Sequence, residues 1–472
     1  MENKKIPLCV DLDGTLIATD ILYESALLLI KKNFLFIFLL PIWLMKGRLH
    51  LKHKLFEYVC PNPEFLPYRQ EVIKYIEEEK FKGRKIILVT ATLQQIAEKI
   101  AEYMFIFDDI IGSDNEVNLV GKAKKERLIS IYGEGNFDYI GDSSKDIYIW
   151  QSSRNAIVVN PSKEIKNSIN NIEKTFVYEV SIPKLIVKEI RVYQWIKNLL
   201  IFFPILLAHS TIIGDYIKLI YAFFAFSFIA SAVYVLNDLM DLESDRAHPR
   251  KRNRPFASGK LPILFSFILI PGLFFGSLLI SFLALPIEFI IVLFIYFTIT
   301  TAYSFLLKKI YVMDIITLAV LYTIRLVAGA VTAEIPISPW FLSFSVFIFF
   351  SLAVLKRYTE LLTLKELNKK QTSGRDYFVD DIQLLNSLGT SSGLISVLIF
   401  ALYLNSPEVT QLYNNPIILY SIIPFLMYWV TRIWFKAHRG QMHDDPIVFT
   451  GKDPASYIIF FIIALIIVGA TI

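Results

Sequence analysis

The 472-residue sequence contains few cysteines and few charged side chains. Two cysteines, Cys9 and Cys60, cannot build a disulfide framework, which fits a reducing compartment. Charged residues make up 19% of the chain and hydrophobic residues 54%, which excludes an ordinary soluble protein. We recognise no signal peptide, internal repeat or low-complexity tract. We therefore expect the N-terminal part to stay in the cytoplasm.

The charges that are present are unevenly distributed. Residues 1–190 carry many Lys, Asp and Glu side chains, whereas most of 191–472 consists of long apolar runs. Together with the length, this contrast predicts two or more domains. We place a first domain at 1–175 and a membrane domain at 189–472. The polar stretch 161–183 indicates a linker between them, which we set at 176–188.

Nine apolar stretches are long enough to cross a bilayer, which needs about 20 residues each. Alternate connections hold nearly all of the local Lys and Arg, so the positive-inside rule places that side in the cytoplasm. We expect an all-α, multi-pass membrane domain of nine helices in a bacterial-type inner membrane, with the N-terminus of the protein inside and its C-terminus outside. The stretches lie near 190–208, 217–236, 262–283, 286–303, 313–333, 339–356, 384–404, 415–436 and 455–472.

A further apolar run, 33–45, is too short to span a bilayer. It contains Pro41 and is flanked by Lys31, Lys32 and Lys46. Two interpretations are open, an interfacial helix and a core helix of the first domain.

The stretch 237–254 places a group of acids before a basic cluster, directly after an apolar run. Asp238, Asp241 and Asp245 are spaced i, i+3 and i+7, so on a helix they share one face. Neighbouring carboxylates repel one another unless a cation lies among them, and Mg²⁺ commonly joins carboxylates to substrate phosphates. The stretch predicts a Mg-diphosphate site at a membrane surface. The alternative is a solvated charged loop between two helices.

The first domain has acids at the ends of predicted strands. A strand pattern at 6–13 ends in Asp11 and Asp13, a second at 85–89 ends at Thr90, and a third at 137–140 precedes Asp142 and Asp146. Strands that alternate with helical stretches indicate an α/β domain with an open parallel sheet, whose ligands gather at the carboxyl ends of the strands. Acids from two strands can meet there around one Mg²⁺.

Together with Gly121-Lys122-Ala123-Lys124, these motifs resemble the haloacid dehalogenase (HAD) superfamily of aspartate-nucleophile phosphatases over about 6–160. The resemblance implies that Asp11 attacks phosphorus and that Asp13 acts as general acid and then base. It also implies a helical cap at about 20–80. The alternative is an inactive scaffold. The implied phosphoryl-binding residues are Thr90 and Lys124, with Lys122 as a competing choice, and the implied metal residues are Asp11, Asp13, Asp142 and Asp146.

The motif Asn237-Asp238-x-x-Asp241-x-x-x-Asp245 resembles the first aspartate-rich motif of the UbiA superfamily of intramembrane prenyltransferases, over about 185–472. That resemblance implies Asn237 and the three acids as Mg²⁺ residues, with Asp241 and Asp245 catalytic. The usual second pair of acids is replaced by Asp314 with two lysines. Fewer acids and more bases favour reactants that carry additional phosphate. For Asp314 a second Mg²⁺ and a pair with Arg325 are both open.

Fragments at 194–198, 248–255 and 356–360 resemble the decaprenyl-phosphate phosphoribosyltransferase branch of the UbiA superfamily. This branch implies transfer of 5-phosphoribose from phosphoribosyl diphosphate to polyprenyl (decaprenyl) phosphate in the lipid bilayer. The implied substrate-binding residues are Lys197, Asn198, Lys251, Arg254, Tyr303, Lys308, Lys309, Arg325, Lys356 and Arg357.

The two resemblances suggest consecutive reactions, because the transferase product would carry a phosphomonoester that a HAD phosphatase removes. The resulting lipids serve as donors for arabinan and other cell-wall glycans. The alternative is transfer of a prenyl chain to an aromatic or other acceptor, with a HAD domain that is regulatory or acts on another phosphomonoester. We expect no nucleic-acid partner, and a homo-oligomer stays open.

Overall fold

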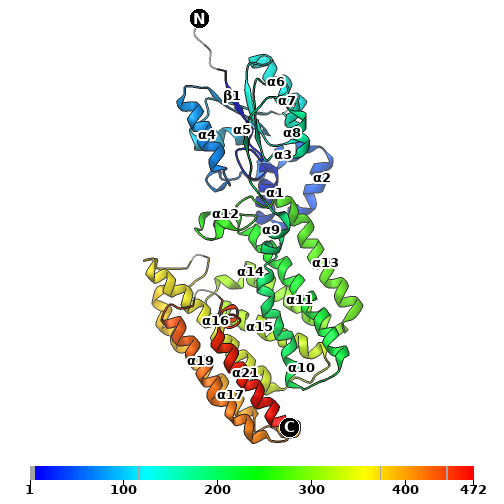
Figure 1. Cartoon of the computed structure of the whole chain (residues 1–472), viewed down its shortest axis with the longest axis vertical. Helices are drawn as coiled ribbons and strands as arrows, with labels where there is room; N and C mark the ends of the chain where they lie inside the picture. The colour runs from blue at the N-terminus through cyan, green and yellow to red at the C-terminus, as the bar shows by residue number, and fades with distance from the viewer. Residues whose placement is uncertain (1–5, 115–116, 373, 443–444, 472) are drawn as a thin grey trace. The chain divides into compact units, whose positions relative to one another are not determined.

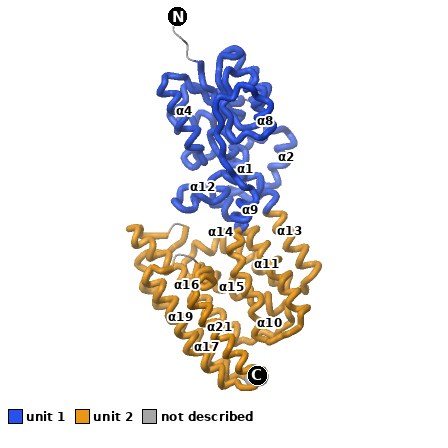
Figure 2. The backbone as a smooth tube through the Cα atoms, viewed as in Figure 1, with its two compact units in different colours: residues 1–190, 234–269 blue, residues 191–233, 270–472 orange. Residues whose placement is uncertain are grey.

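The computed structural model describes residues 6–114, 117–372, 374–442 and 445–471. The chain divides into two compact units (Figure 2). Unit 1 comprises residues 1–190 and 234–269, and unit 2 comprises residues 191–233 and 270–472. The aspartate-rich stretch, which we assigned to the membrane domain, therefore groups with the N-terminal residues.

Unit 1 contains a six-stranded sheet in which every neighbouring pair is parallel (Figure 1). The strand order is β3-β2-β1-β4-β5-β6. The inner strands β1, β4 and β5 are buried throughout, as expected for a parallel sheet with both faces covered. The strands are β1 (Leu8–Val10), β2 (Ile86–Leu93), β3 (Asp109–Ser113), β4 (Asp138–Gly141), β5 (Ala156–Val159) and β6 (Ile172–Phe176).

Helices cover both faces of this sheet, because successive strand residues point to opposite sides. Leu8 and Val10 of β1 belong to a core that includes α4 (Gln70–Phe81) and α5 (Gln94–Met104). Cys9, between them, belongs to a second core formed with α6 (Lys122–Tyr132), α7 (Ile147–Trp150) and α8 (Lys163–Ser168). The structure thus has the predicted α/β organisation.

The stretch 161–183, interpreted above as a linker, contains α8 and the edge strand β6. The three central residues of β6 are exposed, and an edge strand tolerates such a polar sequence because one of its sides faces solvent. The expected linker at 176–188 begins at the last residue of β6 and includes most of α9 (Ile182–Glu189).

The segment between β1 and β2 is helical, as expected for a cap. It contains α1 (Ile21–Lys32), η1 (Phe34–Phe38), α2 (Leu39–Met45), α3 (Arg48–Tyr58), η2 (Pro63–Phe65) and α4. No residue of η1 or α2 is buried, and Phe38 and Met45 are 67% and 87% exposed. The interpretation of 33–45 as a core helix is therefore wrong, because too much apolar surface stays uncovered. The interfacial helix stays a prediction.

The membrane part has eight helices, among the described residues, that are long and apolar enough to span a bilayer. The predicted span at 190–208 is instead η4 (Val192–Phe202) followed by α10 (Phe203–Leu207), and the count reaches nine only with α9 as part of one broken span. The predicted fold class is confirmed. The eight helices are α11 (Ile213–Met240), Ile263–Ala284 with α13 (Ser266–Ala284), α14 (Ile287–Phe305), α15 (Met313–Thr332), α16 (Pro339–Glu366), Val379–Tyr403 with α17 (Ile382–Tyr403), Pro416–His438 with α19 (Ile422–His438), and α21 (Pro454–Thr471).

Helix α15 is the most enclosed of these helices, with 78% of its apolar window buried. It packs against η4 at Gly329, where an added Cβ atom would lie 1.9 Å from the carbonyl oxygen of Ile201. Small residues permit such close backbone approach between membrane helices.

Gly329→Ala is therefore expected to destabilise unit 2, because the clash is with backbone atoms that cannot rotate away. Overpacking of this kind costs about 1–3 kcal/mol. The measurement is the thermal unfolding midpoint of the detergent-solubilised protein. Gly469→Ala is the matched control, since no atom of the described residues lies within 4 Å of the position that its Cβ would take. Equal midpoints for both variants would contradict the close approach.

Candidate functional site

Asp11 lies immediately after β1 and forms a buried ion pair with Lys124 of α6. The Lys124 Nζ lies 2.8 Å from Asp11 Oδ1 and 3.0 Å from the Tyr139 hydroxyl oxygen. That hydroxyl donates in turn to Asp146 Oδ1 at 3.0 Å. Burial raises the pKa of Asp11 to about 6, although the Lys124 charge acts in the opposite direction. The pair keeps a carboxylate oxygen in a fixed position at the carboxyl end of the sheet.

Asp13 has both carboxylate oxygens engaged. Asp13 Oδ1 accepts from the Ile21 backbone N–H at 2.8 Å, and Oδ2 accepts from the Thr92 hydroxyl at 2.9 Å. Burial, together with the charge of Asp20, raises the pKa of Asp13 to about 8. A carboxyl group that is protonated near neutral pH is suited to donate a proton to a leaving oxygen.

Three of the predicted metal residues converge. Ligand oxygens of Asp11, Asp142 and Asp146 lie within 4.8 Å of one another. Burial and the charges of the other two acids raise the pKa of Asp142 well above its usual range, so a cation among them would relieve the repulsion. Gly14 has φ +76° and an added Cβ would lie 2.2 Å from Asp142 Oδ2, which leaves room only for glycine. The residues fit a Mg²⁺ ion, and Asp13 lies outside this group.

The remaining predicted phosphatase residues differ in position. Thr90 lies inside the longer strand β2, fully buried, and its hydroxyl accepts from the Thr92 backbone N–H at 3.0 Å. Lys122 is exposed, with its Nζ 5.4 Å from the centre of the Tyr148 ring. Of the two lysines considered, Lys124 therefore contacts Asp11.

The aspartate-rich stretch lies at a helix break in unit 1. Asn237 and Asp238 are in the last turn of α11, Asp241 precedes α12 (Leu242–Ala247), and Asp245 lies within α12. Arg254 Nη1 lies 2.9 Å from Asp238 Oδ1 and 2.5 Å from Asp245 Oδ2.

Arg254 thus bridges two of these buried acids, while its own side chain is partly exposed. Lys251 Nζ is 4.0 Å from Asp245 Oδ1, a buried oxygen that has no hydrogen-bond partner among the described residues. An unsatisfied carboxylate oxygen beside further acids fits a cation ligand.

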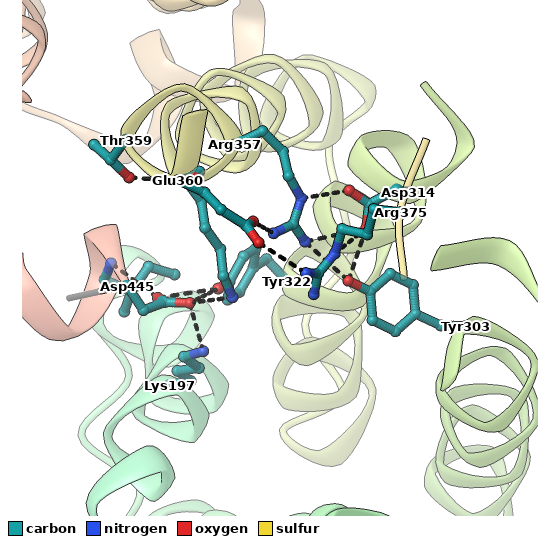
Figure 3. Close-up of polar contacts among 11 residues, drawn as sticks. Lys197, Tyr303, Asp314, Tyr322, Arg357, Thr359, Glu360, Arg375 and Asp445 are labelled. Atoms are coloured by element: carbon teal, nitrogen blue, oxygen red, sulfur yellow. Dashed lines mark hydrogen bonds and ion pairs between the residues drawn. The ribbon is translucent and has the colours of Figure 1, made fainter. Parts of the chain in front are cut away.

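A buried network in unit 2 surrounds Asp314, the single acid of the altered second motif (Figure 3). Arg357 pairs with Asp314 through Nε and through Nη2, the latter at 3.1 Å from Oδ1. The Tyr303 hydroxyl donates to Asp314 Oδ1 at 2.8 Å. Glu360 accepts from Arg357 at 2.7 Å and from Arg375 at 3.0 Å. Two acids and two guanidinium groups therefore balance in charge.

Arg325 does not supply the partner that we considered for Asp314. Its Nε donates to Asn198 Oδ1 at 2.8 Å, and its Nη2 donates to the Tyr296 hydroxyl at 3.0 Å. Asn198 also donates to Ser227 at 2.9 Å. Arg325 and Asn198 are both buried, so this cluster ties η4, α11, α14 and α15 together.

Asp445, which the sequence analysis did not single out, joins two predicted binding residues (Figure 3). Its Oδ2 lies 2.9 Å from Lys197 Nζ and 2.8 Å from Lys356 Nζ. Burial alone would raise the pKa of Asp445, but the Lys356 and Lys197 charges hold it well below its usual range. Two ammonium groups on one carboxylate leave a net positive charge, which suits a phosphate ligand. Only the fold reveals this group, because its three members are far apart in the chain.

The paired lysines of the second motif form η7 (Leu307–Lys309). Lys309 is exposed and Lys308 is half-buried. Both precede α15, which carries Asp314 and Arg325.

Comparisons of the sequence with known proteins identify the family of the chain. The sequence profile of the UbiA prenyltransferase family matches residues 198–449. The uncharacterized protein y4nM of Sinorhizobium fredii is 37% identical, over 98% of this chain and 90% of that protein. The decaprenyl-phosphate phosphoribosyltransferase of Mycolicibacterium smegmatis is 41% identical over 181 residues, which are 37% of this chain and 57% of that protein.

Among solved structures, a phospho-aspartyl intermediate analogue of phosphoserine phosphatase is 17% identical, with a TM-score of 0.27. The matched region covers 37% of this chain and 94% of the phosphatase chain. The family profile and the relative from Sinorhizobium fredii show that the chain belongs to the UbiA prenyltransferase family, and its N-terminal part contains a six-stranded parallel sheet.

Proposed function

We propose that the protein is a Mg²⁺-dependent polyprenyl-phosphate phosphoribosyltransferase whose HAD-like domain removes the 5-phosphate from the lipid product. The observation that carries the proposal is the buried Asp11–Lys124 pair, which lies in the same domain as Asp13 and three converging acids that fit a metal ion. The same chain has a region similar in sequence to decaprenyl-phosphate phosphoribosyltransferases. The first activity yields a lipid that carries a 5-phosphomonoester, and the second activity hydrolyses that phosphomonoester.

In the transferase step, an oxygen of the lipid phosphate forms a bond to ribose C1 while the bond from C1 to diphosphate breaks. Asn237, Asp238, Asp241 and Asp245 would hold Mg²⁺, which neutralises charge on the departing diphosphate. Arg254 and Lys251, which now contact the acids, would turn to diphosphate oxygens.

Unit 2 has its own basic residues that we propose to bind phosphate. The Lys197–Asp445–Lys356 group supplies a net positive charge, and Lys308 and Lys309 add two more cations. The remaining proposed binding residues, Asn198, Tyr303, Arg325 and Arg357, are engaged with one another or with Asp314 and would hold the basic side chains of unit 2 in position.

In the phosphatase step, an Asp11 oxygen attacks phosphorus and the bond from phosphorus to ribose O5 breaks. Asp13 donates its proton to O5, and then takes a proton from the water that hydrolyses the aspartyl-phosphate. The Lys124 ammonium would offset the charge of the phosphoryl group, and the Thr90 hydroxyl would donate a hydrogen bond to it. Asp11, Asp142 and Asp146 would hold Mg²⁺, which would supply further positive charge there. The products are inorganic phosphate and polyprenylphosphoryl ribose, a donor lipid for envelope glycans.

The protein is a multi-pass membrane protein. We further propose a plasma-membrane location with both active sites on the cytoplasmic face, since the Lys- and Arg-rich connections favour that side.

The test supplies labelled phosphoribosyl diphosphate, polyprenyl phosphate and Mg²⁺ to the full-length protein in liposomes. We expect a labelled ribosyl lipid that disappears when Mg²⁺ is chelated, and Asp241→Asn is expected to reduce its formation by about a hundredfold or more. Transfer of label from prenyl diphosphate to an aromatic acceptor, with no labelled ribosyl lipid, would overturn the proposal.

A further inference from the structure

The cavity beside Asp11 and Asp13 has a wall from a distant part of the chain. Its volume is about 1500 Å³, and its lining comes from the cap, from the carboxyl ends of the strands and from residues 246–264. This last segment directly follows the aspartate-rich stretch in sequence and belongs to unit 1.

A buried ion pair fixes the segment to the cap. Arg246 lies 2.6 Å and 3.1 Å from the two carboxylate oxygens of Glu24 in α1, and both side chains are almost fully buried. Arg246 also donates to the carbonyl oxygens of Ala257 and Phe65, at 3.0 Å and 3.2 Å. The Thr19 hydroxyl donates to the same Glu24 at 2.8 Å. Both side chains of this pair belong to unit 1, so the ion pair holds residues 246–264 in place as one wall of the cavity.

The segment also touches the loop that carries the catalytic acids. Gly259 has φ +69°, and an added Cβ atom would lie 2.5 Å from the carbonyl oxygen of Ala18. Only glycine permits this approach, which brings the segment against Ala18, five residues after Asp13.

Two cations of the segment line the cavity without partners. Arg252 and Lys260 are exposed, and the described part of the chain provides neither side chain with a hydrogen bond or ion pair. Arg246 and Arg254, by contrast, each form an ion pair with an acid. The Asp11–Lys124 site is sufficient to bind one phosphomonoester. The two additional cations are therefore suited to bind a second anionic group of the same substrate.

The lining of the cavity also includes apolar side chains. Ile263 and Leu264 follow Lys260 in the wall, and Leu264 is 49% exposed. Leu22 of the cap and Ile182 of α9 also line the cavity. An anionic group joined to a hydrocarbon chain matches this arrangement.

We propose that Arg252 and Lys260 bind the phosphodiester of a prenyl-linked sugar phosphate while its terminal phosphomonoester lies at Asp11. The inference rests on the proposed function and assigns to residues 246–264 the recognition of the lipid-linked substrate. The phosphatase thereby distinguishes the diester-containing lipid from soluble sugar phosphates.

The test compares two substrates of the full-length protein in detergent, a short-chain prenyl phosphodiester of ribose 5-phosphate and ribose 5-phosphate itself. The wild type should have the lower KM for the diester. Arg252→Ala/Lys260→Ala should raise that KM about tenfold or more, since two charge-assisted hydrogen bonds are lost. Its kcat, and its KM for ribose 5-phosphate, should stay unchanged.

Arg250→Ala is the matched control, because Arg250 is an exposed cation of the same segment that does not line the cavity. It should leave both KM values unchanged. If the wild type prefers the diester and the double variant keeps that preference, the inference fails while the proposed phosphatase activity stands. If the wild type hydrolyses neither substrate, the proposed phosphatase activity fails as well.

Discussion

Replacing Asp11 by Asn is expected to lower hydrolysis of the 5-phosphate by about three orders of magnitude or more, since no other group can form the aspartyl-phosphate. The amide has nearly the same shape but is no nucleophile, and it leaves Lys124 in contact with Tyr139. The transferase step should continue, so the labelled lipid should accumulate with its 5-phosphate in place. Thin-layer separation of the two lipids measures the ratio directly.

Glu102→Gln is the matched control, because Glu102 is an exposed acid on α5 of the same domain. It removes one charge without touching the site and should yield the same product as the wild type. If Asp11→Asn still makes the dephosphorylated lipid at the wild-type rate, Asp11 is not the nucleophile. If the wild type and Asp11→Asn both accumulate the phosphorylated lipid, the N-terminal domain acts on another substrate.

Replacing Asp314 by Asn is expected to destabilise unit 2 by about 3–5 kcal/mol, the usual cost of breaking a buried ion pair. Asp314 and Arg357 are almost completely buried, and the variant leaves two guanidinium groups facing only Glu360. The measurement is the denaturant midpoint of the detergent-solubilised protein, followed by tryptophan fluorescence.

The same variant tests the metal role that was open for Asp314, since Arg325 contacts Asn198 and Tyr296 instead. Because its oxygens are engaged by Arg357 and Tyr303, the Mg²⁺ concentration for half-maximal transferase activity should not change. Asp376→Asn, an exposed acid in the same unit, should match the wild type in both measurements. A wild-type midpoint with a raised Mg²⁺ requirement would favour a metal role instead.

Short-range patterns in the sequence predicted the elements that carry the candidate sites. The strand before Asp11, the strand before Asp142 and the helices of the segment 20–80 all appear in the structure, within a few residues of their expected limits. Long apolar runs likewise predicted eight of the spanning helices. Such features depend on residues that are close in the chain, and for that reason periodicity and composition reveal them.

Weaker patterns failed where tertiary contacts decide the conformation. The sequence of β6 is polar, so it resembled a linker. The strand is stabilised by pairing with β5, which the local sequence does not reveal. The first span appeared continuous, although it contains the 3-10 helix η4. The apolar run 33–45 appeared compatible with a core, yet its side chains are largely exposed.

The sequence by itself predicted the family, which the comparisons confirm, and it suggested two kinds of chemistry and most of the charged residues that we propose for them. Only the tertiary structure decided which charges meet: Lys124 with Asp11, Arg357 with Asp314, Lys197 and Lys356 with Asp445, and Arg246 with Glu24. These partners are separated by 43 to 248 positions. Pairing over such separations depends on burial and on the packing of whole elements, because a buried charge must find an opposite charge that local sequence does not specify.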